Sequence, residues 1–235
     1  MFSTSTILLT GVGAEGQVGE VVASAFAKLG ASLILVDRRS EKAEARAAAL
    51  VRDGGRARGY GCDLTSAQAV TELADAVQRE HGDVLHALVH LAGGFAMSGP
   101  VAESAVDVWD RQLGINLKTA YVTARAFLPM LRRGRGSLVF FASPAALPGA
   151  SVARMSAYAA AKSGVVALMR AVAAEEREHG VRANALAPNT IRTATNVRAM
   201  GTDARYVERE QVADAVVYLC SPQASAISGT VVPLE

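Results

Sequence analysis

Short apolar runs alternate along this chain with longer segments in which apolar residues recur every three or four positions. The runs predict strands at 7–9, 33–36, 58–61, 87–91, 137–142, 181–186 and 231–232. The periodic segments predict a helix that follows Gly19 and ends at about residue 29, and further helices at about 40–53, 66–81, 106–131, 156–179 and 211–220. This alternation predicts an α/β fold of the Rossmann type, a doubly wound parallel sheet of about seven strands with helices on both faces. Residues 189–206 have no clear period and are predicted to form a loop or a small lid.

Composition narrows the class of protein further. The 235 residues suit one large domain, and no repeat or change of composition marks a boundary, so we predict a single domain, 1–235. Although 51% of the residues are hydrophobic, no uninterrupted apolar run approaches the ~20 residues that cross a bilayer. The start of the chain lacks the charged and apolar regions of a secretory signal. These features predict a protein without a membrane partner.

Charge and cysteine usage agree with this interpretation. The net charge is only +2 and the basic residues are scattered, apart from Arg132, Arg133 and Arg135, which we interpret as a solvated helix end. Nucleic acid is therefore not an expected partner. Cys62 and Cys220 are isolated, as expected for buried thiols in a reducing compartment, so we predict a cytoplasmic location.

A glycine-rich turn follows the first predicted strand. Gly11, Gly13 and Gly16 have the spacing that lets a backbone approach a pyrophosphate at a helix N-terminus. Asp37 ends the next predicted strand, where a carboxylate would accept bonds from the adenosine ribose and favour NAD. Arg38 and Arg39 leave NADP possible, because a guanidinium binds a 2′-phosphate well. An ordinary tight turn is the alternative, but strand, turn, helix, strand and acid in series favour dinucleotide binding.

The helix at 156–179 carries a tyrosine and a lysine four residues apart. Tyr158 and Lys162 share one face with Val165, Met169 and Val172. If this face is removed from water, an ammonium at ~4 Å is expected to lower the pKa of the phenol from ~10 to roughly 7. Such a tyrosine would act as an acid or base at neutral pH. The alternative is an amphipathic helix whose two polar tips reach the surface, so the pair is only suggestive by itself.

With these motifs in order, the chain resembles the short-chain dehydrogenase/reductase family over nearly its whole length. The segments that carry the resemblance are Thr10-Gly11 with Gly16 and Gly19, Cys62-Asp63-Leu64, Ala92-Gly93-Gly94, Trp109 to Asn116, Gly136 to Ser143, Tyr158 with Lys162, and Pro188 to Thr193. Each segment is weak alone, and their order and spacing together are specific.

The resemblance implies an NAD(P)-dependent oxidoreductase that transfers a hydride between nicotinamide and a small carbonyl or alcohol substrate. It implies Tyr158 as general acid/base, Lys162 as its neighbour at the nicotinamide ribose, and Ser143 on the substrate oxygen. Asn116 would hold a water linked to Lys162. The cofactor-binding residues would be Thr10, Gly11, Gly13, Gly16, Gln17, Val18, Asp37, Arg38, Asp63, Leu64, Ala92, Gly93, Tyr158, Lys162, Pro188, Ile191 and Thr193.

Several positions depart from the family pattern. The glycine turn is two residues longer than usual, His90-Leu91 replaces an Asn-Asn pair, and Asn189 replaces a glycine. Ser143 precedes Tyr158 by fifteen residues where thirteen is usual. None of these changes removes a catalytic residue. The alternatives for Ser143 and Asn116 are a strand-end turn residue and a solvent-facing helix residue.

The sequence also leads to expectations about a second possible function, metal binding and subunit assembly. A catalytically silent dinucleotide-binding regulator of the same fold remains the second hypothesis. The four histidines have no metal-ligand spacing, so no metal is expected. An apolar pocket or simple core packing would explain Phe95, Met97, Leu147, Met155 and Met200. A homodimer or homotetramer is expected through a small-residue face formed by Ala157, Ala160, Ala161, Gly164, Leu168 and Ala171.

Overall fold

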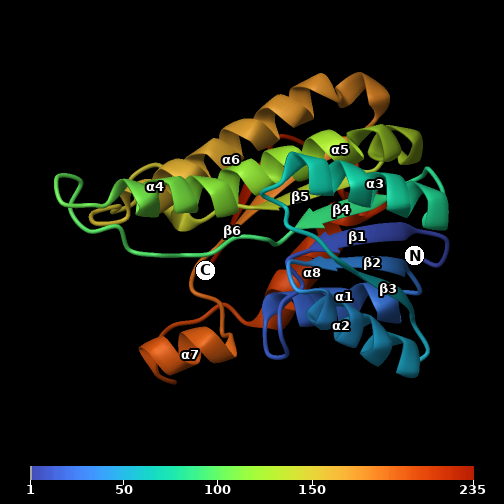
Figure 1. The fold of residues 1–235 in the computed structure, drawn as a ribbon, viewed down its shortest axis with the longest axis horizontal. Coiled ribbons are helices and arrows are strands. Elements are labelled where there is room, and N and C mark those ends of the chain that lie inside the picture. The colour runs from blue at the N-terminus through green and yellow to red at the C-terminus, as the bar shows by residue number, and fades with distance from the viewer. Residues whose placement is uncertain (1) are drawn as a thin grey trace.

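The computed structural model describes residues 2–235, and its centre is a sheet of seven strands in the order β3-β2-β1-β4-β5-β6-β7 (Figure 1). All six neighbouring pairs are parallel. The strands are β1 (Thr6–Thr10), β2 (Ser32–Asp37), β3 (Arg56–Gly61), β4 (Ala87–His90), β5 (Ser137–Phe141), β6 (Arg182–Pro188) and β7 (Val231–Leu234). The predicted Rossmann-type fold class is confirmed.

The central strands are buried on both faces. Ile7, Leu8 and Leu9 of β1 have no exposed surface, and all four residues of β4 are buried. Strands covered on both sides are uniformly apolar instead of alternating, which is why short apolar runs marked them in the sequence. The edge strand β3 has exposed residues along its length.

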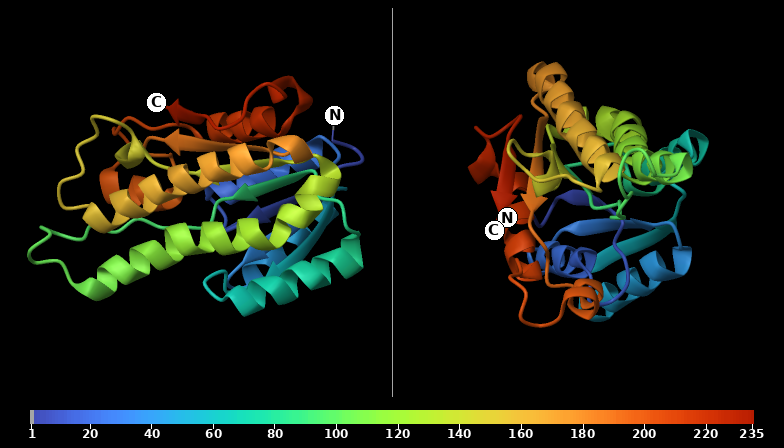
Figure 2. Two further views of the ribbon diagram at one scale, coloured as in Figure 1. Left: turned by 90° about the horizontal axis from the view of Figure 1, so that it is seen from above. Right: turned by 90° about the vertical axis from the view of Figure 1, so that its left-hand side faces the viewer.

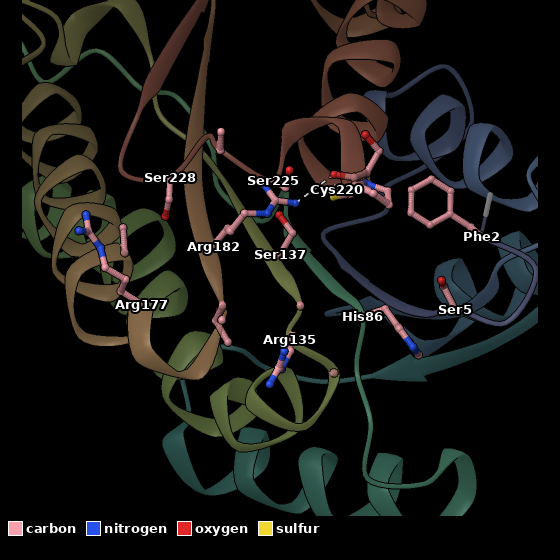
Figure 3. A pocket seen from close by; sticks show the side chains of 18 residues that line it. Phe2, Ser5, His86, Arg135, Ser137, Arg177, Arg182, Cys220, Ser225 and Ser228 are labelled. Carbon is pink, nitrogen blue, oxygen red and sulfur yellow. Dashed lines mark hydrogen bonds between the residues drawn. The ribbon is translucent and has the colours of Figure 1, made fainter.

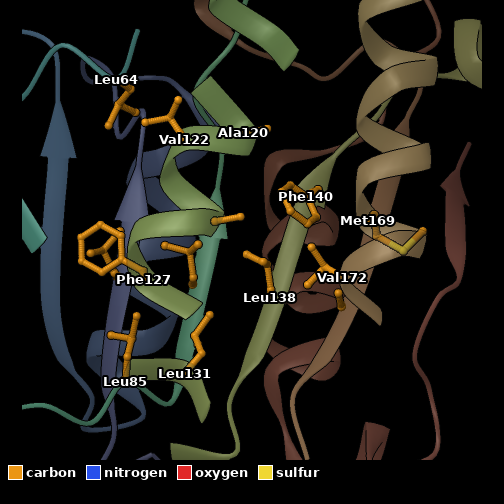
Figure 4. Close-up of a cluster of buried hydrophobic side chains, with 14 of the residues drawn as sticks. Leu64, Leu85, Ala120, Val122, Phe127, Leu131, Leu138, Phe140, Met169 and Val172 are labelled. Atoms are coloured by element: carbon orange, nitrogen blue, oxygen red, sulfur yellow. The ribbon is translucent and has the colours of Figure 1, made fainter. Parts of the chain in front are cut away.

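Helices cover the sheet in two layers, which are seen edge-on in Figure 2. One layer contains α1 (Val18–Lys28), α2 (Ser40–Arg52) and α8 (Arg209–Cys220); the other contains α3 (Ala67–His81), α5 (Thr119–Gly134) and α6 (Ser156–Glu175). The cluster under α5 and α6 includes the fully buried Phe127, Leu131 and Phe140 (Figure 4). The cluster under α1 and α8 is built around Phe26 and Leu9. The two cores hold the sheet and therefore the strand ends that carry the candidate site.

The helix expected at 106–131 is interrupted. It consists of α4 (Val106–Gln112), a π-helical segment (Leu113–Lys118) and α5. Asn116 Nδ2 donates to the carbonyl oxygen of Gln112 at 3.0 Å, which gives that oxygen a partner within the wider turns. The apolar period continues on both sides of the segment, so periodicity could not reveal it.

Two further boundaries differ from the sequence expectation. A short helix, α7 (Ala194–Met200), lies in the segment expected to be a loop; it has no buried residue and so no apolar period. Thr193 caps it by accepting from the Asn196 amide at 3.2 Å. The helix expected at 156–179 ends as α6 at Glu175, and a separate 3-10 turn spans Arg177–His179. Ser156 is its first residue and not its N-cap, which is Met155.

The faces of α6 are mostly as predicted. Lys162, Val165, Met169 and Val172 are buried against the sheet. The assignment of Ala157 and Ala161 to the face toward another subunit is wrong, because both side chains are buried inside the protomer. Within residues 2–235, α6 is also the only helix long and apolar enough to cross a membrane by composition. Half of that stretch is buried within the protein, as is usual for a core helix.

Candidate active site

The sequence-predicted site residues lie at the carboxyl edge of the sheet, where strand order reverses. β1 lies between β2 and β4, so the connections after β1 and β4 leave the sheet on opposite sides. Ligands of open α/β sheets bind in the crevice at such a point. In Figure 1 the start of α4, the start of α6 and α7 all extend beyond this edge.

The glycine turn after β1 uses its glycines at backbone conformations that other residues rarely adopt. Gly11, Gly13 and Gly16 have positive φ angles of 68°, 66° and 77°. A Cβ atom on Gly11 would lie 2.6 Å from the backbone nitrogen of Ala92, so the turn contacts the end of β4 at close range. Asp37 Oδ2 accepts from the Gly13 amide at 2.9 Å, which ties the end of β2 to the turn.

The glycine turn is also held by a group that the sequence analysis missed. The amide of Gly16 donates to Glu20 Oε2 at 2.7 Å. Arg46 and Arg209 lie 2.8 and 3.6 Å from the same carboxylate. Burial acts to raise the pKa of Glu20, but the Gly16 amide and Arg46 outweigh it and lower the pKa. Glu20 occupies the third helical position after Gln17, where acidic residues commonly cap a helix, so a signal was present.

The segment after β6 lies directly on this turn. Ala194 N donates to Gly16 O at 3.4 Å, and Gln17 Nε2 donates to Thr195 Oγ1 at 3.2 Å. Pro188 ends β6 and Thr193 is buried as the cap of α7. Ile191 bridges to Val207, and Val18 begins α1. A cavity of about 600 Å³ lies beside Gly16, between Thr193 and Arg209.

Three further residues that were expected to bind the cofactor lie beyond the ends of β2 and β3. They are Arg38, Asp63 and Leu64. Arg38 is exposed, and its charge helps to lower the pKa of Asp63. The larger cause is Thr65, whose hydroxyl and amide donate to Asp63 Oδ1 at 2.7 and 2.9 Å. Leu64 is buried. The structure thus brings Arg38 and Asp63 to the same end of the sheet as Asp37.

His90 replaces the first asparagine of the family pattern and connects two parts of the site. Its Nδ1 lies 3.0 Å from Thr10 Oγ1 and its Nε2 lies 3.2 Å from Thr119 Oγ1. Thr119 donates its own proton to Ile115 O at 2.8 Å, so we assign the imidazole proton to Nε2. Burial, and then the charge of Lys162, lower the pKa of His90 to about 3. A neutral imidazole therefore links the turn to the helix that carries Asn116.

Lys162 is buried beside Tyr158. Its Nζ donates to the carbonyl oxygen of Phe141, at the end of β5, at 2.7 Å and lies 5.9 Å from the centre of the Tyr158 ring. Burial lowers the pKa of Lys162 to about 8. The helical spacing therefore brings the two side chains together as predicted, and a strand end fixes the ammonium.

The expected lowering of the Tyr158 pKa is not found in the protein alone. Burial raises the pKa of Tyr158, and the neighbouring Ser143 hydroxyl opposes this only in part. The ammonium of Lys162 is directed to Phe141 O, and its own pKa of about 8 reduces its charge in mildly basic solution. At neutral pH the resting side chain is a phenol that holds its proton.

Ser143 and Asn116 are both oriented by backbone. Ser143 is buried and its Oγ accepts from the Ala145 amide at 3.3 Å, so it is a strand-end turn residue and also a neighbour of Tyr158. Asn116 is buried, so the solvent-facing alternative is wrong. Its side chain accepts from Gly94 N at 3.1 Å and donates to Gly94 O at 3.0 Å.

Gly93 lies beside both the side-chain amide of Asn116 and the ammonium of Lys162. A Cβ atom on Gly93 would lie 2.6 Å from Asn116 Oδ1 and 3.5 Å from Lys162 Nζ. Both side chains therefore border the same space at the end of β4, next to Ala92. This is the region where the resemblance predicted a cofactor contact.

Among the residues expected to line an apolar pocket, Phe95 packs directly on Tyr158. Its ring packs edge to face on Tyr158, with 5.0 Å between ring centres. Met97 and Met200 are more than half exposed, whereas Leu147 packs against the core. Met155 is partly buried. Among residues 2–235, no three His, Cys, Asp or Glu side chains are grouped as a metal site would require.

Proteins with similar sequences and structures are known. The sequence model of a family described as enoyl-(acyl carrier protein) reductase matches residues 11–235. D-threitol dehydrogenase of Mycolicibacterium smegmatis is 35% identical over 92% of this chain and 86% of its own. 2-(S)-hydroxypropyl-CoM dehydrogenase 3 of Xanthobacter autotrophicus is 34% identical over 95% of this chain and 92% of its own. A short-chain type dehydrogenase/reductase structure from Mycobacterium ulcerans superposes with a TM-score of 0.90 at 30% identity, covering 99% of this chain and 88% of that one.

Proposed function

This chain belongs to the short-chain dehydrogenase/reductase family and is a nicotinamide-dependent oxidoreductase, and from that premise we propose that Tyr158 is its general acid/base. The observation that carries the proposal is the grouping of the partly buried Tyr158 with the buried Ser143 and Lys162 beside the end of β5. The substrate would be a small carbonyl compound or the corresponding alcohol.

The residues present fit a dinucleotide. Glycines at positive φ leave three positions of the turn without side chains, and the first amides of α1 have no acceptor within the helix. Glu20 would repel a pyrophosphate, but Arg46 and Arg209 neutralise it. Thr10 to Val18 would hold the pyrophosphate, Asp37 the adenosine ribose, and Pro188 to Thr193 the nicotinamide end. When bound, the nicotinamide supplies or accepts the hydride.

Tyr158 manages the proton. Its phenol, kept protonated by burial, donates to the substrate oxygen in reduction and accepts a proton from the alcohol in oxidation. The nearby Lys162 ammonium favours the phenolate that remains after proton donation. Ser143 donates a hydrogen bond to the substrate oxygen as negative charge develops on it. Asn116 fixes the backbone at Gly94 through two hydrogen bonds and so orients the segment Gly93-Gly94, which lies beside Lys162.

NAD is the preferred cofactor in this proposal. Asp37 presents a carboxylate at the end of β2, which accepts bonds from ribose hydroxyls and repels a 2′-phosphate. Arg38 is the group that would favour NADP instead. Titration with NADH and NADPH measures this choice: tighter binding of NADH is expected, and a clear preference for NADPH would overturn the assignment.

A screen of carbonyls and alcohols by nicotinamide absorbance tests turnover. Reduction of at least one small carbonyl is expected. Cofactor binding without turnover of any compound would support the silent regulator, which the dehydrogenase relatives do not favour. We further propose a cytoplasmic homodimer or homotetramer, with the exposed parts of α5 and α6 as the shared surface.

A further inference from the structure

A second cavity, of about 590 Å³, opens at the edge of the sheet opposite to the active site (Figure 3). It is bordered by residues before β1 and β4, by the starts of β5 and β6, and by the turn after α8. Arg135, Arg177, Arg182 and His86 line it together with several serines. No Asp or Glu from the described chain, 2–235, lines it. Its charge is therefore of one sign.

Arg182 is the central cation of this cavity. In Figure 3 its side chain extends from β6 toward Ser137 and Cys220. Its guanidinium donates only to the carbonyl oxygens of Ile227 and Ser221, each at 3.3 Å. Burial lowers the pKa of Arg182. Arg182 is partly buried. A partly buried guanidinium with only neutral acceptors carries a desolvation cost, and an anion in the cavity would offset that cost.

Two carboxylates near the cavity are paired with other arginines. Glu176 binds Arg132 through two 2.7 Å bonds, and Asp83 lies 3.3 Å from Arg133. Neither of these arginines lines the cavity. Over residues 2–235, no ion pair involves Arg135, Arg177 or Arg182.

The nearby thiol does not supply a negative charge either. Cys220 lines the cavity, and burial raises its pKa to about 12, so it is neutral at physiological pH. The guanidinium of Arg182 thus has no anionic partner within the described chain.

The cavity also offers neutral donors. His86 Nδ1 accepts from the Thr6 amide at 3.0 Å, so a neutral ring carries its proton on Nε2 and can donate it. Ser228 Oγ accepts from the Ala183 amide at 3.3 Å, which leaves its hydroxyl proton available. Guanidinium groups combined with such donors are the usual chemistry for binding phosphate oxygens.

We propose that this cavity binds a small phosphate-bearing molecule at a site separate from the dinucleotide site. The space is within the range of small-molecule sites. A phosphate group with two negative charges suits a cavity lined by three arginines and by no carboxylate of the described residues better than a carboxylate with one charge does. Arg182 is the anchor, and Arg135 and Arg177 at the rim complete the positive charge. The site does not depend on which substrate the carboxyl edge uses.

Calorimetric titration with inorganic phosphate at constant ionic strength tests the proposal. Arg182→Gln is expected to weaken phosphate binding at least about tenfold, and Arg177→Gln, at an exposed position, severalfold. Arg52→Gln, which removes an exposed charge on α2, is the matched control and should bind as the wild type does.

Repeating the titration with NADH present separates phosphate held at the glycine turn from phosphate held here. Binding that persists with NADH and is weakened by Arg177→Gln supports the site, even if Arg182→Gln fails to fold. Absence of phosphate binding by the wild type, or equal binding by Arg177→Gln and the control, would overturn it.

Discussion

Burial sets the protonation states of the three titratable side chains at the centre of the active site. It lowers the pKa of Lys162 to about 8 and that of His90 to about 3, and it raises the pKa of Tyr158. The helical spacing of Tyr158 and Lys162 could be read from the sequence, and the structure confirms that they meet. The directions of the pKa shifts could not be read from the sequence, because they depend on how deeply each group is buried and on Phe141 O as an acceptor.

His90 leads to a prediction on stability. Its folded pKa lies below the unfolded value of 6.5, so the unfolded chain takes up a proton first as the pH falls. The contribution of His90 to the free energy of unfolding is therefore complete above pH ~6.5, and the protein should lose about 2 kcal/mol of stability through this residue by pH 5. Denaturant titrations at pH 7.5 and 5 measure this loss. His90→Asn should lose less on acidification; an identical loss would contradict the burial argument.

At the scale of elements, the sheet and its helices followed from apolar runs and periods because parallel strands are buried on both faces. Two elements could not be predicted in this way. The π-helical segment at Asn116 lies inside a continuous apolar period, and the short α7 has no buried residue and so no apolar period. The glycine turn was predicted as a motif, but its shape depends on Glu20, Arg46 and Arg209, which come from three helices far apart in sequence.

Gly19 provides a prediction for the packing of α1 on this turn. A Cβ atom there would lie 2.3 Å from Val12 O, so Gly19→Ala must move the helix or the turn. We expect the free energy of unfolding to fall by about 2 kcal/mol, as for other overpacked cores. Gly114→Ala is the matched control, because nothing lies within 4 Å of its added atom. Chemical denaturation of both variants at one protein concentration measures the difference, and equal stability would refute the close approach.

At the scale of the whole molecule, the sheet separates two sites of different chemistry. The carboxyl edge gathers the predicted catalytic and cofactor residues, which the resemblance found because family motifs mark them. The opposite edge gathers arginines that are distant in sequence and form no motif, so only the fold brings them together. The surface of α5 and α6 remains the expected subunit contact, with Tyr121 and Ala167 exposed on it.

Ala167→Arg tests that contact. The side chain is exposed in the protomer, so the variant should fold, but a long charged group on a shared helical face should separate subunits. Sedimentation equilibrium at micromolar concentration should give a dimer or tetramer for the wild type and a smaller mass for the variant. Ala48→Arg, the same change on exposed α2, should keep the wild-type mass. A monomeric wild type would contradict the assembly.

The central claim is that Tyr158 transfers the proton, and Tyr158→Phe tests it most directly. The ring remains packed against Phe95 while the hydroxyl is lost, so NADH should bind as before. Turnover of the best carbonyl substrate, followed by nicotinamide absorbance, should fall at least about 100-fold. Tyr121→Phe, at an exposed position on α5, should keep full activity. Undiminished turnover by Tyr158→Phe would contradict the account.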